Sequence, residues 1–436
     1  MKLENSNLLL EINGHIFGNF TIELQSAADI FHDDFKYTYI GGSTIINDVF
    51  HKDKFYSGEV IRTSKGIRAG KSQSIFDNHA YFFIDEELVL GNFRADDNMI
   101  VNIEPLCHHP ENDIKEKNDE SLILYSNKKV RRYEEKEPKL LERDKHKLAL
   151  NPFDPSKNMA DIKIVGHYSI LNSPIKRNHL ISYLAFIYFP TYEIFRYTTF
   201  KDKSKNIKNL RLQVKEIQLY LVKSHDLKDD SPVNSLDAFI DVFNNFEKKN
   251  RHSASIIITY QQFPDDDNTL GIAFTKGICN GVNNVAAVKI QDISPATGLI
   301  ELHQNIHTIL HEMGHLFGSL HDHNRIEKDC KDKKYVMDYE TSPEYKNFIR
   351  FSPCSHVEIV KNLEIRGGCF GPQKKEVARP QFIYYKDNKH LWVDVGSFNI
   401  SKEDNNQHEP SIPKLGLPVL IIFIGVLMCL CIRCSL

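Results

Sequence analysis

Two histidines four residues apart, His311 and His315, are the residues of this 436-residue chain that point most directly to chemistry. On a helix this spacing places both imidazoles on one face, where both can reach one metal ion. Glu312 follows His311 and points to the side, so its carboxylate can contact a water on the metal without being a ligand. This is the position that a general base requires.

A sharp turn after the helix is predicted from Gly318, because glycine readily adopts the positive φ that ends a helix. The turn would bring His321 back as a third ligand; His323 is a second candidate, but the spacing from Gly318 favours His321. Three neutral ligands leave the fourth position of zinc open, where the metal lowers the pKa of bound water to about 7. The pattern predicts one Zn²⁺ and attack on a carbonyl group, with Glu312 as general base.

The elements that must position this helix form an α/β pattern over residues 158–372, where expected strands and helices alternate. We expect a mixed sheet with covering helices. Pro190 falls inside the first expected helix, which predicts a kink or a helix in two pieces. Residues 1–126 contain short alternating apolar runs separated by Gly, Asn and Asp, which predict a separate β-rich domain.

The remaining segments are predicted from charge and apolar content. Residues 127–157 form a charged linker, whose basic cluster ending at Arg132 is either a solvated turn or a processing site. Residues 373–414 are polar and are expected to be a stalk. Residues 415–432 carry no charge and predict a transmembrane helix, with a buried core helix as the alternative. The last residues, 433–436, would be a short tail.

Composition limits the class of partner and the location. The net charge of −3 gives no reason to expect a nucleic-acid partner, whereas the apolar segment predicts contact with membrane lipid. Residues 1–20 contain no recognisable signal peptide, so the bulk of a single-pass chain would lie in the cytosol if the N-terminus were complete.

The residues from His311 to Asp322 resemble the metzincin zinc-protease motif, and Asp322 is typical of its ADAM/adamalysin branch. The sequence is most similar to the tumour necrosis factor-alpha-converting-enzyme group of sheddases. That resemblance implies an α+β metzincin-like catalytic domain with a mixed sheet and an active-site helix. It also implies a prodomain in residues 1–126, and a Met-turn at Met337 beneath the zinc ligands.

The same resemblance assigns a substrate-binding edge strand and two disulfide bonds. The edge strand comprises Leu270, Gly271, Ile272 and Ala273. The bonds would join Cys279 to Cys369 and Cys330 to Cys354, although spacing alone allows three pairings. Disulfides persist in oxidising compartments, so we expect an extracellular or luminal catalytic domain and an incomplete or atypical N-terminus. No cysteine lies between Cys369 and Cys429, so no disintegrin module is expected.

The resulting functional prediction is a membrane-anchored zinc metalloendopeptidase. Its substrates would be extended, juxtamembrane segments of proteins at the cell surface, so its role would be ectodomain shedding. A catalytically silent, ADAM-like adhesion or decoy protein is the alternative, and the presence of Glu312 with all three histidines favours the enzyme.

Overall fold

The structure is a computed structural model of the 436-residue chain. It describes residues 8–14, 18–41, 50–63, 66–67, 79–85, 88–96, 99–105, 122–125, 131–132, 153–154, 156–173, 175–221, 252–261, 263, 269–280, 283–290, 292–294, 299–300, 302–338, 340–341, 347–372 and 389–398. None of the helices in these ranges is long and apolar enough to cross a membrane. The membrane helix and short tail expected at residues 415–436 lie outside the described residues.

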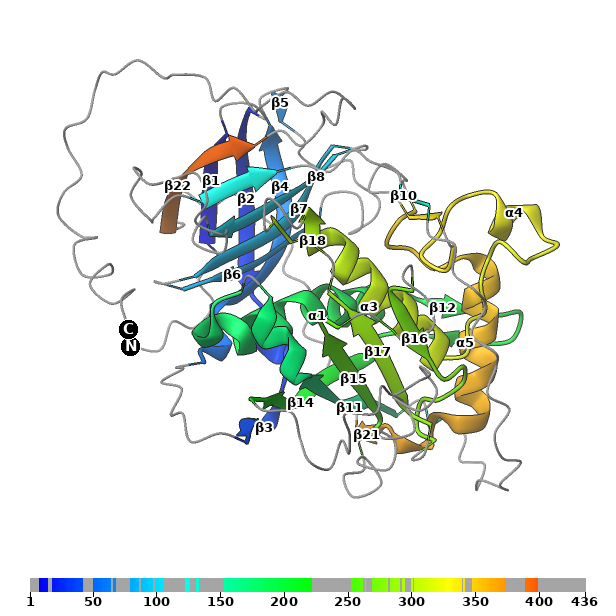
Figure 1. The fold of residues 1–436 in the computed structure, drawn as a ribbon. Helices are drawn as coiled ribbons and strands as arrows, with labels where there is room; N and C mark the ends of the chain where they lie inside the picture. Colours follow the sequence, from blue (N-terminus) through cyan, green and yellow to red (C-terminus); the bar gives the residue numbers. More distant parts are fainter. Residues whose placement is uncertain are drawn as a thin grey trace, which may run out of the picture.

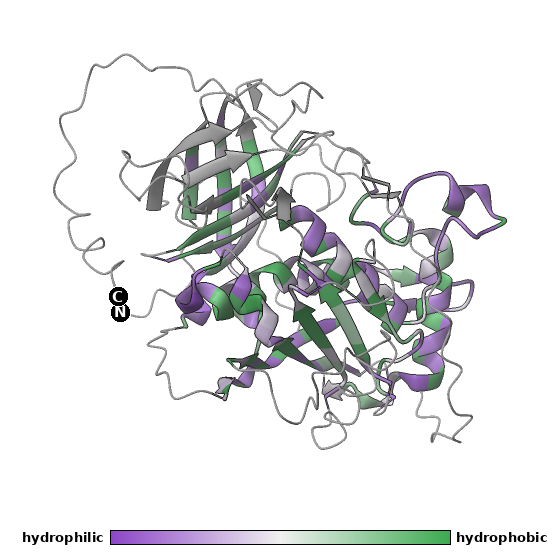
Figure 2. Ribbon diagram, in the orientation of Figure 1, coloured by the Kyte–Doolittle hydropathy of each residue, from purple (hydrophilic) through white to green (hydrophobic). Residues whose placement is uncertain are grey.

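A mixed sheet forms the lower half of the molecule in Figure 1. Its strands are, in order, β16 (Gly271–Ala273), β17 (Val285–Lys289), β15 (Ala254–Thr259), β11 (Lys157–Gly166), β14 (Arg211–Tyr220) and β3 (Phe31–Ile40). Strand β16 is antiparallel to β17, whereas the other neighbours in this order are parallel. A short strand, β21 (Gly371–Pro372), pairs with β11. The β15 and β17 strands are hydrophobic along most of their length (Figure 2), as expected of parallel strands covered on both faces.

Within the described residues, four α-helices accompany this sheet. They are α1 (Leu180–Tyr197), α3 (Leu302–Leu316), α4 (Lys328–Lys331) and α5 (Pro353–Arg366). Helix α1 continues through Pro190, so the prediction of a helix in two pieces is wrong. A proline inside a helix costs about 3 kcal/mol, but α1 is buried from Leu180 to Phe195, and this packing offsets the lost backbone hydrogen bond.

A second sheet, the strand ring, lies on the other side of α1 (Figure 1). Its order is β2 (Gly18–Ser26), β1 (Leu8–Gly14), β22 (Lys389–Phe398), β9 (Leu122–Tyr125), β8 (Met99–Pro105), β7 (Val89–Asp96), β6 (His79–Ile84), β4 (Phe55–Thr63) and β5 (Gly66–Ile67). Strand β2 also pairs with β4, which closes eight of these strands into a ring. Apolar side chains that include Leu10, Ile22, Phe82 and Phe93 form a separate core in this sheet.

Two strands cross the boundaries that the sequence predicted. Strand β3 lies within residues 1–126, but it pairs with β14 of the mixed sheet. Strand β22 lies within the interval 373–414, where we expected a stalk, but it pairs with β1 and β9 of the strand ring. These pairings join segments far apart in sequence, and such pairings leave no local pattern from which they could be predicted.

Short paired strands complete the description. They are β10 (Arg131–Arg132) with β20 (Glu340–Thr341), β12 (Phe200–Lys201) with β13 (Asn206–Ile207), and β18 (Asp292–Ser294) with β19 (Leu299–Ile300). The pairing of β10 places Arg132, the end of the basic cluster, opposite Glu340.

Candidate metal centre and active site

Three histidine side chains meet at the C-terminal end of α3. His311 and His315 lie on one face of this helix, one turn apart. Gly318 has a φ of +100°, as the sequence predicted, and the chain turns there so that His321 faces the helix. The Nε2 atom of His321 lies 3.1 Å from Nε2 of His311 and 3.0 Å from Nε2 of His315. The three histidines form the one metal-binding group found among the described residues.

The hydrogen bonds of the Nδ1 atoms determine that the Nε2 atoms face the shared metal position. His311 Nδ1 donates to the carbonyl oxygen of Val336 at 2.7 Å, and His315 Nδ1 donates to that of Ser319 at 2.8 Å. A carbonyl oxygen only accepts, so both rings carry their proton on Nδ1 and direct the Nε2 lone pair inward.

Burial keeps these rings neutral at pH 7. Loss of hydration lowers the pKa of His315 to about 4 and that of His321 to about 2, and it lowers the pKa of His311 well below its usual value. Neighbouring histidines also oppose protonation of His311 and His321. Neutral imidazoles are the form that binds metal ions. Tetrahedral ligands of zinc at 2.0–2.1 Å would lie about 3.3 Å apart, close to the spacing of the Nε2 atoms. The donor set therefore fits zinc.

Glu312 lies beside the edge strand that the sequence assigned to substrate. Its carboxylate is buried, and a Cβ added at Gly271 would lie 2.5 Å from Oε1 of Glu312. Gly271 is the first residue of β16, and on its other side this strand pairs with β17. A glycine is needed here because any side chain would displace the carboxylate. Ile272 and Ala273 are the other two residues of β16, whereas Leu270, which we expected in this strand, precedes it.

Met337 lies beneath the histidine helix. A Cβ added at Gly314 would lie 2.4 Å from the methionine Sδ, so sulfur and helix backbone are in close contact between the two histidine positions. Val336, whose carbonyl oxygen accepts the hydrogen bond from His311 Nδ1, immediately precedes Met337. The carbonyl oxygen of Met337 itself accepts a hydrogen bond from the backbone N–H of Asp322. The methionine is therefore part of the segment that orients two of the ligands.

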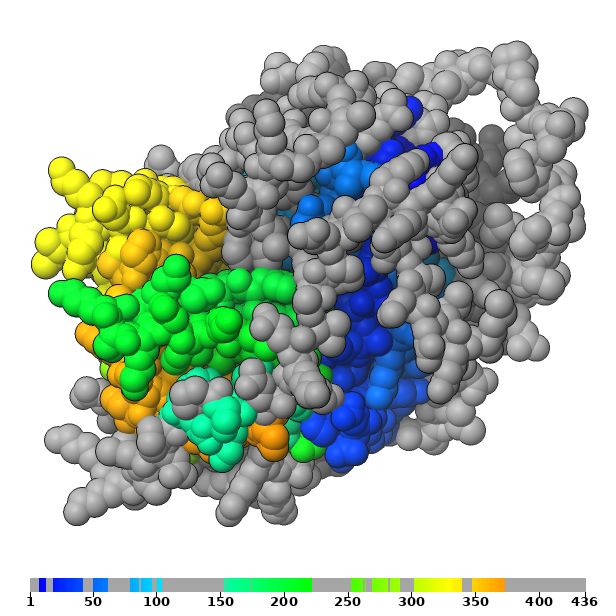
Figure 3. Space-filling view, turned by 180° about the vertical axis from the view of Figure 1, so that it is seen from behind, coloured from blue at the N-terminus to red at the C-terminus, as the bar shows by residue number. Residues whose placement is uncertain are grey.

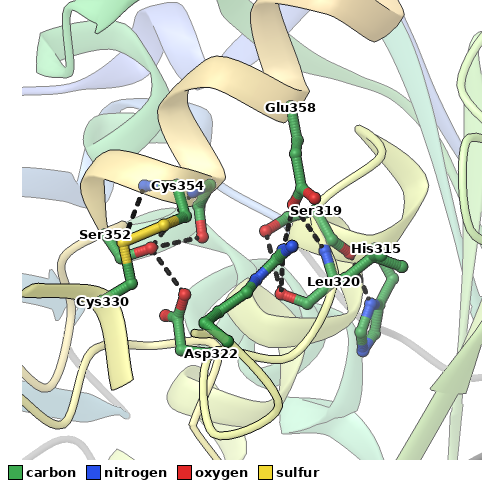
Figure 4. A network of polar contacts seen from close by, with 10 residues as sticks. His315, Ser319, Leu320, Asp322, Cys330, Ser352, Cys354 and Glu358 are labelled. Atoms are coloured by element: carbon green, nitrogen blue, oxygen red, sulfur yellow. Dashed lines mark hydrogen bonds and ion pairs between the residues drawn. A yellow bond between two sulfur atoms is a disulfide. The ribbon is translucent and has the colours of Figure 1, made fainter. Parts of the chain in front are cut away.

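Asp322, next to His321, faces the protein interior. Its Oδ1 accepts a 2.6 Å hydrogen bond from the hydroxyl of Ser352, the residue that caps α5. Burial raises the pKa of Asp322 to about 7, although the bond from Ser352 and the charge of Arg325 oppose this shift. The bond fixes the loop after His321 to the start of α5 (Figure 4).

A second polar contact holds the residue before His321. Glu358 Oε2 accepts from the backbone N–H of Leu320 at 2.9 Å, and Arg325 Nη2 donates to the Leu320 carbonyl oxygen at 3.2 Å. Glu358 and Arg325 also form an ion pair. Figure 4 shows the Glu358 side chain pointing toward Leu320. Both backbone polar groups of Leu320 are therefore held, which restricts where His321 can lie.

The described part of the chain contains two disulfide bonds, Cys279–Cys369 and Cys330–Cys354, which is the pairing that the resemblance implied. The first ties the loop after β16 to the end of α5, and the second ties α4 to the start of α5. Both bonds lie around the segments that carry the site.

Several residues that support the site escaped the sequence reasoning. Gly314, Arg325, Ser352 and Glu358 act through contacts across the fold, and their positions in the sequence gave no separate signal. Gly271 was assigned only as part of the edge strand; a glycine inside a strand is itself a sign of close approach. His323 lies with its ring centroid 5.5 Å from that of His321 and is not part of the metal-binding group.

Comparison with known proteins shows a similarity between this region and a family of metallopeptidases. Residues 196–365 match the model described as "Metallo-peptidase family M12B Reprolysin-like". This part of the chain is similar to reprolysin-like metallopeptidases, which supports a zinc metalloendopeptidase activity. The match includes the three histidines, Glu312 and Met337.

One similar curated protein is the snake venom metalloproteinase trimerelysin-2 of Protobothrops flavoviridis, which is 36% identical over 91 residues. The alignment covers 21% of this chain, and the chain spans 39% of the length of that relative.

Proposed function

We propose that the protein is a membrane-anchored zinc metalloendopeptidase that hydrolyses extended, juxtamembrane segments of other surface proteins. The observation that carries this proposal is that Glu312, which follows the metal-site residue His311 on α3, places its carboxylate against Gly271 at the start of the edge strand β16. A metal site, a general base and a surface for extended backbone then adjoin one another.

His311, His315 and His321 would hold the zinc ion. Zinc bound there would polarise the peptide carbonyl and make a water molecule acidic enough to react at neutral pH. The backbone carbonyls of Val336 and Ser319 keep two of the rings in the required orientation and tautomer. The site is therefore pre-organised before substrate binds.

Glu312 would act as the proton carrier of the reaction. Its carboxylate accepts a proton from water as the water oxygen bonds to the peptide carbonyl carbon. The same proton then passes to the nitrogen of the departing amine as the C–N bond breaks. The carboxylate ends in its starting state, and the products are a carboxylate and an amine.

Substrate would bind as an added strand along β16. One side of β16 is paired with β17, and no described strand pairs with the other side. Main-chain hydrogen bonds to residues 270–273 would hold an extended peptide irrespective of its sequence. Such binding selects unstructured segments, and the linkers that join surface domains to a membrane have this property.

Membrane anchoring is supported by the uncharged residues 415–432, and an extracellular or luminal orientation by the two disulfides. With the motif that ends at Asp322, these features favour an ADAM-type sheddase of the tumour necrosis factor-alpha-converting-enzyme group. A silent adhesion or decoy protein would have no need for Glu312 at this position.

The test is cleavage of quenched extended peptides by the zinc-loaded full chain, both intact and after specific cleavage within residues 133–150. Glu312→Gln should lower kcat/KM by about 10²–10⁴-fold while zinc content and unfolding temperature remain those of the unsubstituted protein. Equal rates for the two proteins, or no cleavage by either with zinc bound, would contradict the proposal.

A further inference from the structure

Helix α1 is buried around its whole circumference. Every residue from Leu180 to Phe195 is buried, and most of them are apolar or aromatic. A helix that covers only one sheet needs a single apolar stripe and can leave its opposite face polar. Helix α1 must therefore be covered from two sides.

The mixed sheet covers one side. The Tyr188 hydroxyl donates to the carbonyl oxygen of Leu212 in β14 at 2.7 Å. The strand ring covers the other side, where the Phe189 ring lies 5.5 Å from Tyr81 and 5.9 Å from Phe55 between ring centroids. Figure 1 shows α1 between the two sheets.

The alternation of side chains in β6 accounts for this second contact. Ala80 and Phe82 belong to the core of the strand ring, whereas Tyr81 and Phe83 belong to the cluster that includes α1. Successive residues of a strand point to opposite faces. One strand thus supplies both cores, and its outward face is aromatic because α1 lies against it.

A polar contact fixes the same interface at Asp29, which precedes β3. Its Oδ2 lies 2.7 Å from Nη1 of Arg196 and accepts a hydrogen bond from the Tyr192 hydroxyl at 3.0 Å. Its carbonyl oxygen accepts from Nε2 of Gln213 at 2.6 Å. The arginine and tyrosine belong to α1 and the glutamine to β14, so one residue is bound to both elements.

The two sheets also exchange strands. Strand β3 leaves the N-terminal part of the chain to extend the mixed sheet beyond β14, and β22 leaves the C-terminal part to close the strand ring between β1 and β9. In the space-filling view blue N-terminal residues and green residues of the middle of the chain lie on the same face of the molecule (Figure 3). Separation would open both sheets.

We propose that the strand ring remains bound to the rest of the protein after the linker at residues 127–157 is cut. The outer face of α1 and the free edge of β14 form its binding surface, and residues 27–40 are the segment that occupies it. Release would expose an aromatic patch and an unpaired strand edge, both of which promote aggregation. This proposal goes beyond the proposed peptidase function and does not depend on it.

The test uses the full chain with recognition sequences for a site-specific protease inserted within residues 133–150 and within residues 373–388. Cleavage at both sites leaves the strand ring and β3 joined to the central fragment, which contains β11, β14 and α1, only by non-covalent contacts. After complete cleavage, verified under denaturing conditions, the fragments should elute together in native size-exclusion chromatography. Separate elution of a folded fragment that contains residues 151–372 would overturn the proposal.

Substitution of Asp29 tests whether the observed contacts hold the fragments together. Asp29→Ala should raise the dissociation constant of the cleaved fragments about tenfold, because Arg196 loses its partner at the interface. Asp34→Ala is the matched control, since this carboxylate lies on β3 but is 82% exposed. Equal effects of the two substitutions would contradict the assignment of this binding surface.

Discussion

The mixed sheet and the strand ring differ in how their residues are used. The mixed sheet carries the histidine helix at one side, and its edge strand places Gly271 against the Glu312 carboxylate. The strand ring contains no metal-binding group among its described residues, and its side chains form an apolar core and a surface for α1. The comparison indicates that the chemistry depends on a few side chains of α3 and of the turn after it, at the edge of the mixed sheet, whereas the ring contributes to stability.

The largest effect on activity is expected from a metal ligand. His321→Ala removes one of three nitrogen donors, so zinc should be lost on dialysis and peptidase activity should fall to background. His323→Ala is the control, because His323 is outside the metal-binding group. Zinc content by atomic absorption distinguishes the two. Loss of zinc from the His323 variant instead would show that the ligand set is wrong.

A substitution in the core of the strand ring should lower stability and leave zinc binding unchanged. Phe82 is fully buried in its core and stacks with Phe93, so Phe82→Ala should lower the free energy of unfolding by about 3–5 kcal/mol. Phe82→Leu should lower it by less. Zinc affinity of the folded protein should be unchanged in both variants, as measured by competition with a chromophoric chelator. A matching loss of zinc affinity would remove the distinction between the two sheets.

A smaller effect on activity is expected at the edge strand. Gly271→Ala places a Cβ within 2.5 Å of the Glu312 oxygen, so either the carboxylate or the strand must move. We expect kcat/KM to fall by about 10–100-fold with zinc content unchanged. Ile272→Val is the comparison on the same strand, since Ile272 belongs to an apolar cluster that does not include Glu312, and it should leave kcat/KM within a factor of two.

The smallest effect is expected from the contacts around Leu320. Glu358→Ala removes the acceptor of the Leu320 N–H and the partner of Arg325, which should weaken zinc binding by about tenfold. Glu358→Gln keeps the acceptor without the charge and should restore part of the affinity. The visible spectrum of the cobalt-substituted protein reports the ligand geometry directly. An unchanged spectrum and affinity in Glu358→Ala would show that this contact does not position His321.

The sequence predicted the parts of the site whose geometry is local. His311, Glu312, His315, Gly318 and His321 fall within eleven residues, so helical spacing and one glycine turn suffice to bring them together.

Contacts between segments far apart in the sequence could not be predicted, because the local periodicity of apolar residues does not indicate them. The pairing of β3 with β14 joins residues nearly 180 positions apart, and the contact of Gly271 with Glu312 requires the assembled sheet. Pro190 was misread because helix propensity is overridden by burial on both sides of α1. Resemblance to a known family supplied Met337 and the cysteine pairing, which the spacing alone left open.

The central claim is that three imidazoles hold one zinc ion and leave a position open beside Glu312. Zinc K-edge X-ray absorption of the purified, zinc-loaded chain measures this directly. We expect one zinc per chain with three nitrogen ligands at about 2.0–2.1 Å and a further oxygen ligand from solvent. A sulfur ligand, or a fourth protein nitrogen that closes the site, would contradict the account.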